Sequence, residues 1–245
     1  MSSSPVTLFG HWICPFSVRV EFALAQRGID YVVVDVPPRA VRPKGFVVPE
    51  EFITHSPKLE VPMVKIDGEY LADSIPILEW LEEKFTDLSL LPADDAGQAI
   101  VRERVDWMNK YVYRPMIGVY YGTDVGLIQE SSVAFMTAME TVGQWLLGNH
   151  WLAGEAPTLA EAIMAGVYTR LDGLAQLGLT GELPASVQQH LQRCTQLVGW
   201  DTVRWTTEQT NEFVSRFLKY REVQNARKNK EKFALCSHLP WMPWP

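Results

Sequence analysis

Apolar residues follow two different periods in the first part of the chain. Residues 6–9 and 31–36 are short runs of β-branched and aromatic residues, which predict two strands, and the second has the continuous apolar character of a buried strand. Between them, residues 18–27 repeat apolar positions at helical spacing and end before Gly28, which predicts a helix. Two strands joined by one helix predict a parallel pair.

A second set of short elements follows. Pro49 predicts the start of a short helix, and Asp67-Gly68 between two strand-like runs predicts a hairpin. Pro62 begins the first of those strands, which indicates an edge strand. The sequence leaves the isomer of its peptide bond undecided: general frequency favours trans, whereas a backbone that must present its polar groups elsewhere favours cis. Asp73 and Ser74 are candidate caps of a further helix. Its predicted inner face is Ile77, Leu78 and Leu81.

The remainder of the chain has a helical pattern. We expect residues 1–85 to form an α/β domain, 86–95 a linker, 96–220 an all-α domain and 221–245 a basic, then proline- and tryptophan-rich tail. Within the all-α part, Pro115 predicts a kink. The expected further helices span 131–147 with Ser131-Ser132 as cap, 159–177, 185–197, and a last helix that Asp201 caps and that ends near residue 220. The apolar tail with Trp241 and Trp244 should pack on the body or on a partner chain.

Composition narrows the class of protein. The 245 residues carry a net charge of −7, and acidic residues are spread along the chain, so nucleic acid is not an expected partner. The three cysteines, Cys14, Cys194 and Cys236, form neither a disulfide framework nor a zinc-site spacing, so we expect no metal and a reducing compartment. With neither a signal-peptide pattern nor a membrane-length apolar run, the expected location is the cytoplasm.

The candidate chemistry lies at Cys14, which stands at the predicted start of the first helix with Pro15 behind it. The first N–H groups of a helix have no intrahelical partner and carry a partial positive charge, which favours a thiolate anion. Because Ser17 is the last residue of this Cys-x-x-Ser motif, where a Cys-x-x-Cys motif has its second cysteine, a disulfide cannot close within it. The alternative is that Cys14 is a small buried core residue.

These elements and motifs together resemble the cytosolic glutathione transferases. The order strand, helix, strand, helix, strand, strand, helix is thioredoxin-like, and Cys14-Pro15-Phe16-Ser17, Val61-Pro62 and Asp73-Ser74 are similar to the family's glutathione-binding motifs. Thr158 and Glu161 are spaced as a capping box and resemble the loop before the family's sixth helix. The resemblance implies a thioredoxin-like domain followed by an all-helical domain.

The resemblance also implies roles for individual residues. Glutathione would be the co-substrate, with Cys14 facing its sulfur, Val61 pairing with its cysteinyl backbone before a cis Pro62, and Asp73 and Ser74 holding the γ-glutamyl end. The remaining candidates are Phe16 and Lys58 for glutathione, and Tyr111 and Arg114 for a small hydrophobic or electrophilic second substrate; an aromatic stripe such as that around Tyr111 is also typical of plain core.

The class and the reaction stay open at this stage. A cysteine at position 14 resembles the omega, lambda and beta classes, residues 18–21 and 27–31 are similar to zeta-like sequences, and Val48 stands where omega-like chains carry lysine. The leading prediction is glutathione-dependent thiol transfer through Cys14. The alternatives are conjugation, isomerisation or dehalogenation with glutathione as nucleophile, and a non-catalytic binding or interaction protein. The resemblance also implies a homodimer, because members of this family usually form dimers.

Overall fold

The computed structural model describes residues 5–236, and its first half is built on a four-stranded mixed sheet. The strand order is β2-β1-β3-β4, with β1 parallel to β2 and antiparallel to β3, and β3 antiparallel to β4. The strands are β1 (Val6–Gly10), β2 (Tyr31–Asp35), β3 (Met63–Ile66) and β4 (Glu69–Ala72). The parallel pair and the hairpin at Asp67-Gly68 are therefore confirmed.

One residue of the sheet fixes where the candidate motifs meet. Met63 is paired with Phe9 on one side and with Ala72 on the other. The segments that follow β1, precede β3 and follow β4 therefore leave the sheet at the same end. Those segments carry Cys14, Pro62 and Ser74, so strand register alone brings the three motifs together.

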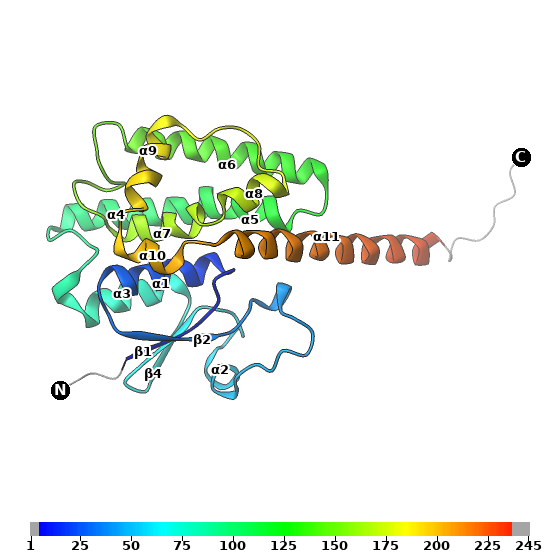
Figure 1. The fold of residues 1–245 in the computed structure, drawn as a ribbon, viewed down its shortest axis with the longest axis horizontal. Helices are drawn as coiled ribbons and strands as arrows, with labels where there is room; N and C mark the ends of the chain where they lie inside the picture. Colours follow the sequence, from blue (N-terminus) through cyan, green and yellow to red (C-terminus); the bar gives the residue numbers. More distant parts are fainter. Residues whose placement is uncertain (1–4, 237–245) are drawn as a thin grey trace, which may run out of the picture.

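The two faces of the sheet carry different layers. Val6 and Leu8 belong to a large core shared with the helices, whereas Phe9 packs with Phe52 in a smaller cluster on the other face, because neighbouring strand residues point to opposite faces. Helices α1 (Pro15–Gln26) and α3 (Ser74–Lys84) lie between the sheet and the helical half, and α2 (Glu50–His55) lies away from it (Figure 1). Ile77, Leu78 and Leu81 are buried, as predicted for the inner face of α3.

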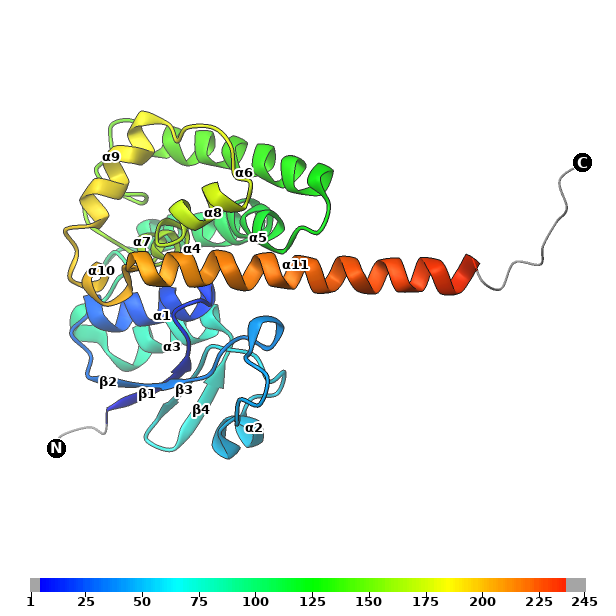
Figure 2. The same ribbon diagram turned by 45° about the vertical axis from the view of Figure 1, so that its right-hand side comes forward.

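The second half is helical, and the two halves together confirm the predicted fold class. Its longest helix, α11, runs along the body and extends past it as a single helix (Figures 1 and 2). The helices are α4 (Asp95–Met108), a π-helical turn (Asn109–Tyr113), α5 (Arg114–Tyr121), α6 (Val125–Trp145), α7 (Leu159–Tyr168), α8 (Leu171–Leu177), α9 (Ala185–Cys194), α10 (Val198–Val203) and α11 (Thr207–Cys236). Two 3₁₀ turns, Arg39–Val41 and Thr86–Leu88, precede it. Within residues 5–236 no helix is long and apolar enough to cross a membrane.

Two expectations about the strands were wrong. β2 is an edge strand rather than a buried one, and Val32 and Val33 remain 49% and 44% exposed. Pro62 does not mark an edge, because β3 lies between β1 and β4. Pro62 precedes the first paired residue, Met63, so its missing N–H removes no ladder hydrogen bond.

Several helix limits also differ from the sequence pattern. Asp124 caps α6 by accepting hydrogen bonds from the N–H groups of Gly126 and Leu127, so the Ser131-Ser132 pair lies inside the helix. The run 159–177 is divided into α7 and α8. Asp201 lies inside α10 instead of capping the last helix, which begins at Thr207 and continues to Cys236, past the expected end near residue 220. Residues of the tail after 236, including Trp241 and Trp244, lie outside the described residues.

Candidate functional site

Cys14 occupies the N-cap of α1, as predicted, with Pro15 in the first turn. Its N–H donates to the carbonyl of His11 (2.9 Å), which closes a tight turn between β1 and the helix. The Cys14 side chain points toward the end of the sheet, where Sγ lies 3.6 Å from the carbonyl oxygen of Val61. The residue is 5% exposed and packs beside Phe9 and Met63. Cys14 therefore lies at the start of α1 and in contact with the loop that precedes β3.

The segment before β3 has a constrained backbone. The Val61–Pro62 peptide bond is cis, as the family resemblance implied, and Leu59 adopts a positive φ of 53°. The hydroxyl of Ser56 donates to the carbonyl of Glu60 and holds the loop from inside. The loop therefore presents the Val61 carbonyl to Cys14 rather than to a neighbouring strand.

Asp73 and Ser74 begin α3 but do not act as ordinary caps. Asp73 has a positive φ of 71°, and its carboxylate makes no capping hydrogen bond; it pairs instead with Lys58 at 2.9 Å, both side chains being exposed. Ser74 is 4% exposed, and its hydroxyl oxygen accepts hydrogen bonds from Arg19. The structure thus brings Lys58 and Asp73 together, and places Ser74 behind them in the first turn of the helix.

Arg19 was missed by the sequence analysis. It is 3% exposed, and besides Ser74 it donates to the Oδ1 atom of Asn109 (2.5 Å). Its guanidinium lies 4.8 Å from the ring centre of Phe16 and 5.0 Å from that of Tyr113. Burial lowers the pKa of Arg19, while the negative charges available to Tyr113 and Cys14 oppose that shift. No local signal in the sequence indicated this role, because Ser74 and Asn109 lie 55 and 90 residues away from Arg19.

A second buried arginine, Arg170, was also missed. It stands at the break between α7 and α8, is completely buried, and reaches the carbonyl of Ile13 at 3.5 Å. Its guanidinium lies 5.1 Å from a ring centre of Trp205, and its Nε and Nη1 atoms have no hydrogen-bond partner among the described residues. Burial lowers its pKa, and negative charge on Tyr120, Tyr113 or Cys14 opposes this. Two cations from different halves of the chain thus face the Cys14 segment.

The two residues predicted for a second substrate lie on the helical half, Tyr111 in the π-helical turn and Arg114 at the start of α5. Tyr111 is 44% exposed and packs on Trp107, with ring centres 5.0 Å apart, and Arg114 is exposed. Neither has a contact with Cys14 among the described side chains. Burial raises the pKa of Tyr113, Tyr120 and Tyr121, and negative charge on Cys14 would raise it further, so these three tyrosines lie on the side of the helical half that faces Cys14.

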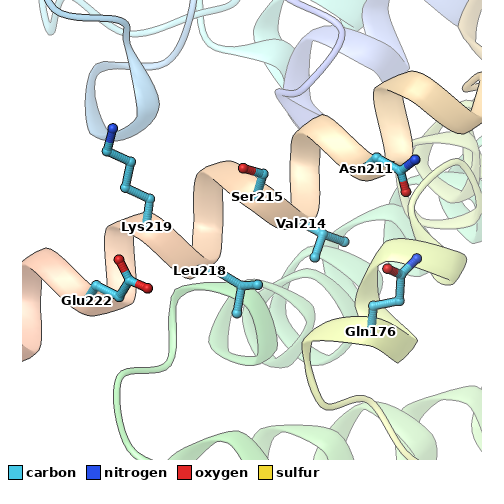
Figure 3. A pocket seen from close by; sticks show the side chains of 7 residues that line it. All are labelled: Gln176, Asn211, Val214, Ser215, Leu218, Lys219 and Glu222. Atoms are coloured by element: carbon cyan, nitrogen blue, oxygen red, sulfur yellow. The ribbon is translucent and has the colours of Figure 1, made fainter.

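Two pockets of the surface lie away from these residues. The larger, about 440 Å³, is formed by α11 and by Gln176 of α8; Val214 and Leu218 point to the side of α8, whereas Lys219 points to the other side of α11 (Figure 3). The smaller, about 360 Å³, surrounds Gly28 and Phe85. Neither is lined by a predicted site residue, and no group of metal-ligating side chains occurs in the described part of the chain.

Comparison with known proteins shows which family has this fold and these motifs. Residues 13–84 match the family model described as glutathione S-transferase, N-terminal domain. Maleylacetoacetate isomerase from Rattus norvegicus is 40% identical over 171 residues, which cover 67% of this chain and 77% of that protein. The chain belongs to the cytosolic glutathione transferase superfamily. This membership confirms the resemblance drawn from the Cys14, Val61-Pro62 and Asp73-Ser74 motifs.

Other members of the superfamily show how far the similarity extends. Maleylacetoacetate isomerase from Mus musculus is 33% identical over 145 residues, covering 59% of this transferase and 60% of its own length. The crystal structure of glutathione transferase Omega 3C from Trametes versicolor superposes with a TM-score of 0.76 at 20% identity, covering 90% of this chain and 93% of that one. Rice GST1 in complex with glutathione also superposes with a TM-score of 0.76, at 16% identity, covering 89% and 100%. These structures share the fold.

Proposed function

We propose that this protein is a glutathione-dependent thiol transferase in which Cys14 is the nucleophile. Membership of the superfamily makes it a glutathione-dependent enzyme with glutathione as co-substrate, which the sequence analysis predicted. The observation that carries the finer proposal is the position of Cys14, whose sulfur lies at a helix N-terminus and 3.6 Å from the Val61 carbonyl. A serine or tyrosine there would stabilise a bound thiolate, whereas a cysteine can itself form a disulfide.

The proposed glutathione site uses the motifs around that sulfur. The backbone of Val61 before cis Pro62 would pair with the cysteinyl residue, and the ammonium of the γ-glutamyl residue would bind the Asp73 carboxylate. Its carboxylate would bind at Ser74, where the first N–H groups of α3 are free. Phe16, Lys58 and Pro62 would complete the site, and we keep Tyr111 and Arg114 as proposals for the second substrate.

The proposed reaction proceeds in two exchanges. The Cys14 thiolate attacks the glutathione sulfur of a mixed disulfide, so that a Cys14–glutathione disulfide forms and the substrate thiolate leaves and takes up a proton. The thiolate of a second glutathione then attacks the glutathione sulfur of that adduct, which releases glutathione disulfide and restores Cys14. Arg19 and Arg170 support the anionic steps, because both are buried cations near Cys14.

Isomerisation is a second candidate, because two mammalian relatives carry the name maleylacetoacetate isomerase. In that reaction bound glutathione adds to the substrate and leaves again, and Cys14 only orients its sulfur. The two candidates make opposite predictions for Cys14→Ser, since a hydroxyl can orient a thiolate but cannot form the disulfide.

The test is a pair of assays on the wild type and on Cys14→Ser. We expect the variant to lose at least about a hundredfold in reduction of a glutathione mixed disulfide. Circular dichroism and retention on immobilised glutathione serve as folding and binding controls. Thiol transfer that survives in Cys14→Ser would contradict the proposal, and retained turnover of maleylacetoacetate would favour isomerisation. A homodimer in the cytoplasm remains a further prediction.

A further inference from the structure

The hydroxyl oxygen of Ser74 accepts two hydrogen bonds from a single arginine, Arg19. Both the Nε atom of Arg19 (2.9 Å) and its Nη2 atom donate to Ser74 Oγ. Arg19 and Ser74 are 3% and 4% exposed, so water does not compete for these hydrogen bonds. The two residues are separated by 55 positions in the chain and join α1 to α3.

This arrangement fixes the direction in which Ser74 can donate. A serine hydroxyl has one proton and two lone pairs. The two N–H groups of Arg19 occupy both lone pairs, so the proton must point away from Arg19. No described residue accepts a hydrogen bond from Ser74 Oγ. The hydroxyl proton is therefore directed away from Arg19, and none of the residues that the structure describes accepts it.

Arg19 is itself held by the π-helical turn. Asn109 begins this turn and accepts from Nη1 at 2.5 Å, and Tyr113 ends it and places its ring 5.0 Å from the guanidinium. Pro115 follows two residues later and has no N–H, so the ordinary helical hydrogen bond to the carbonyl four residues before it cannot form. The wider turn puts Asn109 and Tyr113 on one side, against Arg19. The kink predicted at Pro115 takes this form.

We propose that Arg19 is a positioning residue that, held by Asn109, keeps the Ser74 hydroxyl a donor and so makes the site selective for the γ-glutamyl carboxylate of glutathione. Arg19 acts through Ser74 and does not touch the ligand. This inference rests on the proposed glutathione site and adds to it a residue from α1 and one from the helical half. The buried positive charge of Arg19 behind the hydroxyl strengthens the bond that Ser74 donates to an anion.

The experiment compares two ligands by isothermal titration calorimetry with the full chain. One is glutathione, and the other is the analogue in which the carboxylate of the γ-glutamyl residue is an amide. We expect the wild type to bind glutathione about tenfold or more tightly than the analogue. In Arg19→Gln, Arg19→Lys and Ser74→Ala, we expect glutathione affinity to fall about tenfold and the preference to shrink below about twofold. In Asn109→Ala, which leaves Arg19 in place, we expect about threefold weaker binding.

A double-mutant cycle separates positioning from a general effect on structure. If Arg19 acts through Ser74, Arg19→Gln adds no further loss in a Ser74→Ala background. The matched control is Arg102→Gln, because Arg102 likewise joins another helix, α4, to α3 through Glu79, but is exposed. We expect this control to keep glutathione affinity within about twofold of the wild type. If the Arg19 variants do not fold by circular dichroism, the cycle of Asn109→Ala with Ser74→Ala takes their place.

The outcomes are distinguishable. A preference for the carboxylate that survives in the Arg19 and Asn109 variants, or losses that multiply in the double variants, would overturn the role of Arg19 while leaving the glutathione site intact. A wild type that does not bind glutathione would instead overturn the proposed function, and this inference with it. A preference that disappears together with Arg19 or Ser74, without additivity, supports it.

Discussion

Cys14 and Cys194 are both buried, with 5% and 1% of their surface exposed, yet they occupy opposite ends of their helices. Cys14 stands at the N-cap of α1, whereas Cys194 is the last residue of α9. The N-terminus of a helix carries a partial positive charge and the C-terminus a partial negative charge. The two buried cysteines therefore lie in backbone fields of opposite sign.

The neighbouring side chains increase the difference. Arg19 and Arg170 are buried cations near Cys14. Cys194 lies 3.7 Å from the Nε2 atom of His190, which contacts the buried carboxylate of Glu161 at 3.1 Å. Burial, with the negative charge of Glu161, raises the pKa of the Cys194 thiol well above its usual value. Burial is thus common to the two cysteines, whereas the helix end and the sign of the nearby charges differ between them, and the proposed function depends on this difference.

Of the substitutions considered, the removal of Glu161, whose carboxylate lies in the surroundings of Cys194, should reduce stability most. The carboxylate accepts hydrogen bonds from the N–H groups of Leu152 and Thr158, the latter within the predicted capping box, which is confirmed. We expect Glu161→Ala to lower the free energy of unfolding by about 3 to 5 kcal/mol in urea denaturation. Asp94→Ala, which removes an exposed N-cap, should cost about 1 kcal/mol. Equal losses in the two variants would contradict the account.

Near Cys14, by contrast, a decrease in pH should lower the stability of the fold. His11 is buried, its Nδ1 accepts the N–H of Ile13 (3.0 Å), and burial, with the nearby positive charge of Arg216, lowers its pKa from 6.5 to about 4. The unfolded chain then binds more protons between these values, so we expect stability to fall as pH decreases from about 6.5 to about 4, by at most about 3 kcal/mol. Urea midpoints across this range should show the loss.

The comparison variants for that titration are His11→Gln and His150→Gln. His150 is exposed, so its replacement should leave the acid dependence unchanged. The first variant should lack this part of the dependence, because its amide does not titrate. A dependence that persists unchanged in His11→Gln would show that another group causes it.

The two thiols should differ in native reactivity. We expect iodoacetamide to alkylate Cys14 about a hundredfold faster than Cys194, which corresponds to about 2.7 kcal/mol in activation free energy. Digestion and mass spectrometry after timed quenching measure each peptide separately, and glutathione should protect Cys14. Similar rates at both cysteines would remove the distinction on which the proposed chemistry rests.

The substitution with the smallest expected effect, at Gly166, tests whether packing of the helical half positions the start of α1. A β-carbon at Gly166 would overlap the hydroxyl of Tyr113 and lie 2.7 Å from the carbonyl oxygen of Pro15. We expect Gly166→Ala to cost about 2 kcal/mol in chemical denaturation and to slow alkylation of Cys14 but not of Cys194. Gly126→Ala, where the nearest atom is a carboxylate oxygen of Asp124, is the control. An unchanged Cys14 rate in Gly166→Ala would show that α7 does not hold this helix start.

Local signals were enough to predict the strands, the parallel pair and the hairpin, but not which strands lie at the edges of the sheet. Asp67-Gly68 predicted the hairpin, and the structure adds that Cys14, Pro62 and Ser74 follow or precede strand ends at the same end of the sheet, as the pairing of Met63 with Phe9 and Ala72 shows. The capping oxygen of Asp124 outcompeted Ser131-Ser132 because it satisfies two free N–H groups. Thr206 and Gln209 form reciprocal hydrogen bonds at the start of α11. Their spacing in the sequence is that of a capping box, which the sequence analysis missed.

The arginines were beyond local signals. Arg19 meets Ser74 and Asn109 at separations of 55 and 90 residues, and Arg170 meets Ile13 at a separation of 157. Such contacts depend on how the helical half packs on α1, which periodicity does not report. The exposure of Val32 and Val33 was missed for a similar reason, since a continuous apolar run does not say whether its strand lies inside a sheet or at its edge.

The most direct measurement is the identity of the cysteine that glutathione modifies. The full chain is incubated with glutathione disulfide, its remaining thiols are alkylated, and its peptides are mapped by mass spectrometry. The account predicts a glutathione adduct on the Cys14 peptide, removed by added glutathione, and an unmodified Cys194. A Cys14 that stays free under these conditions, or equal modification of both cysteines, would contradict it.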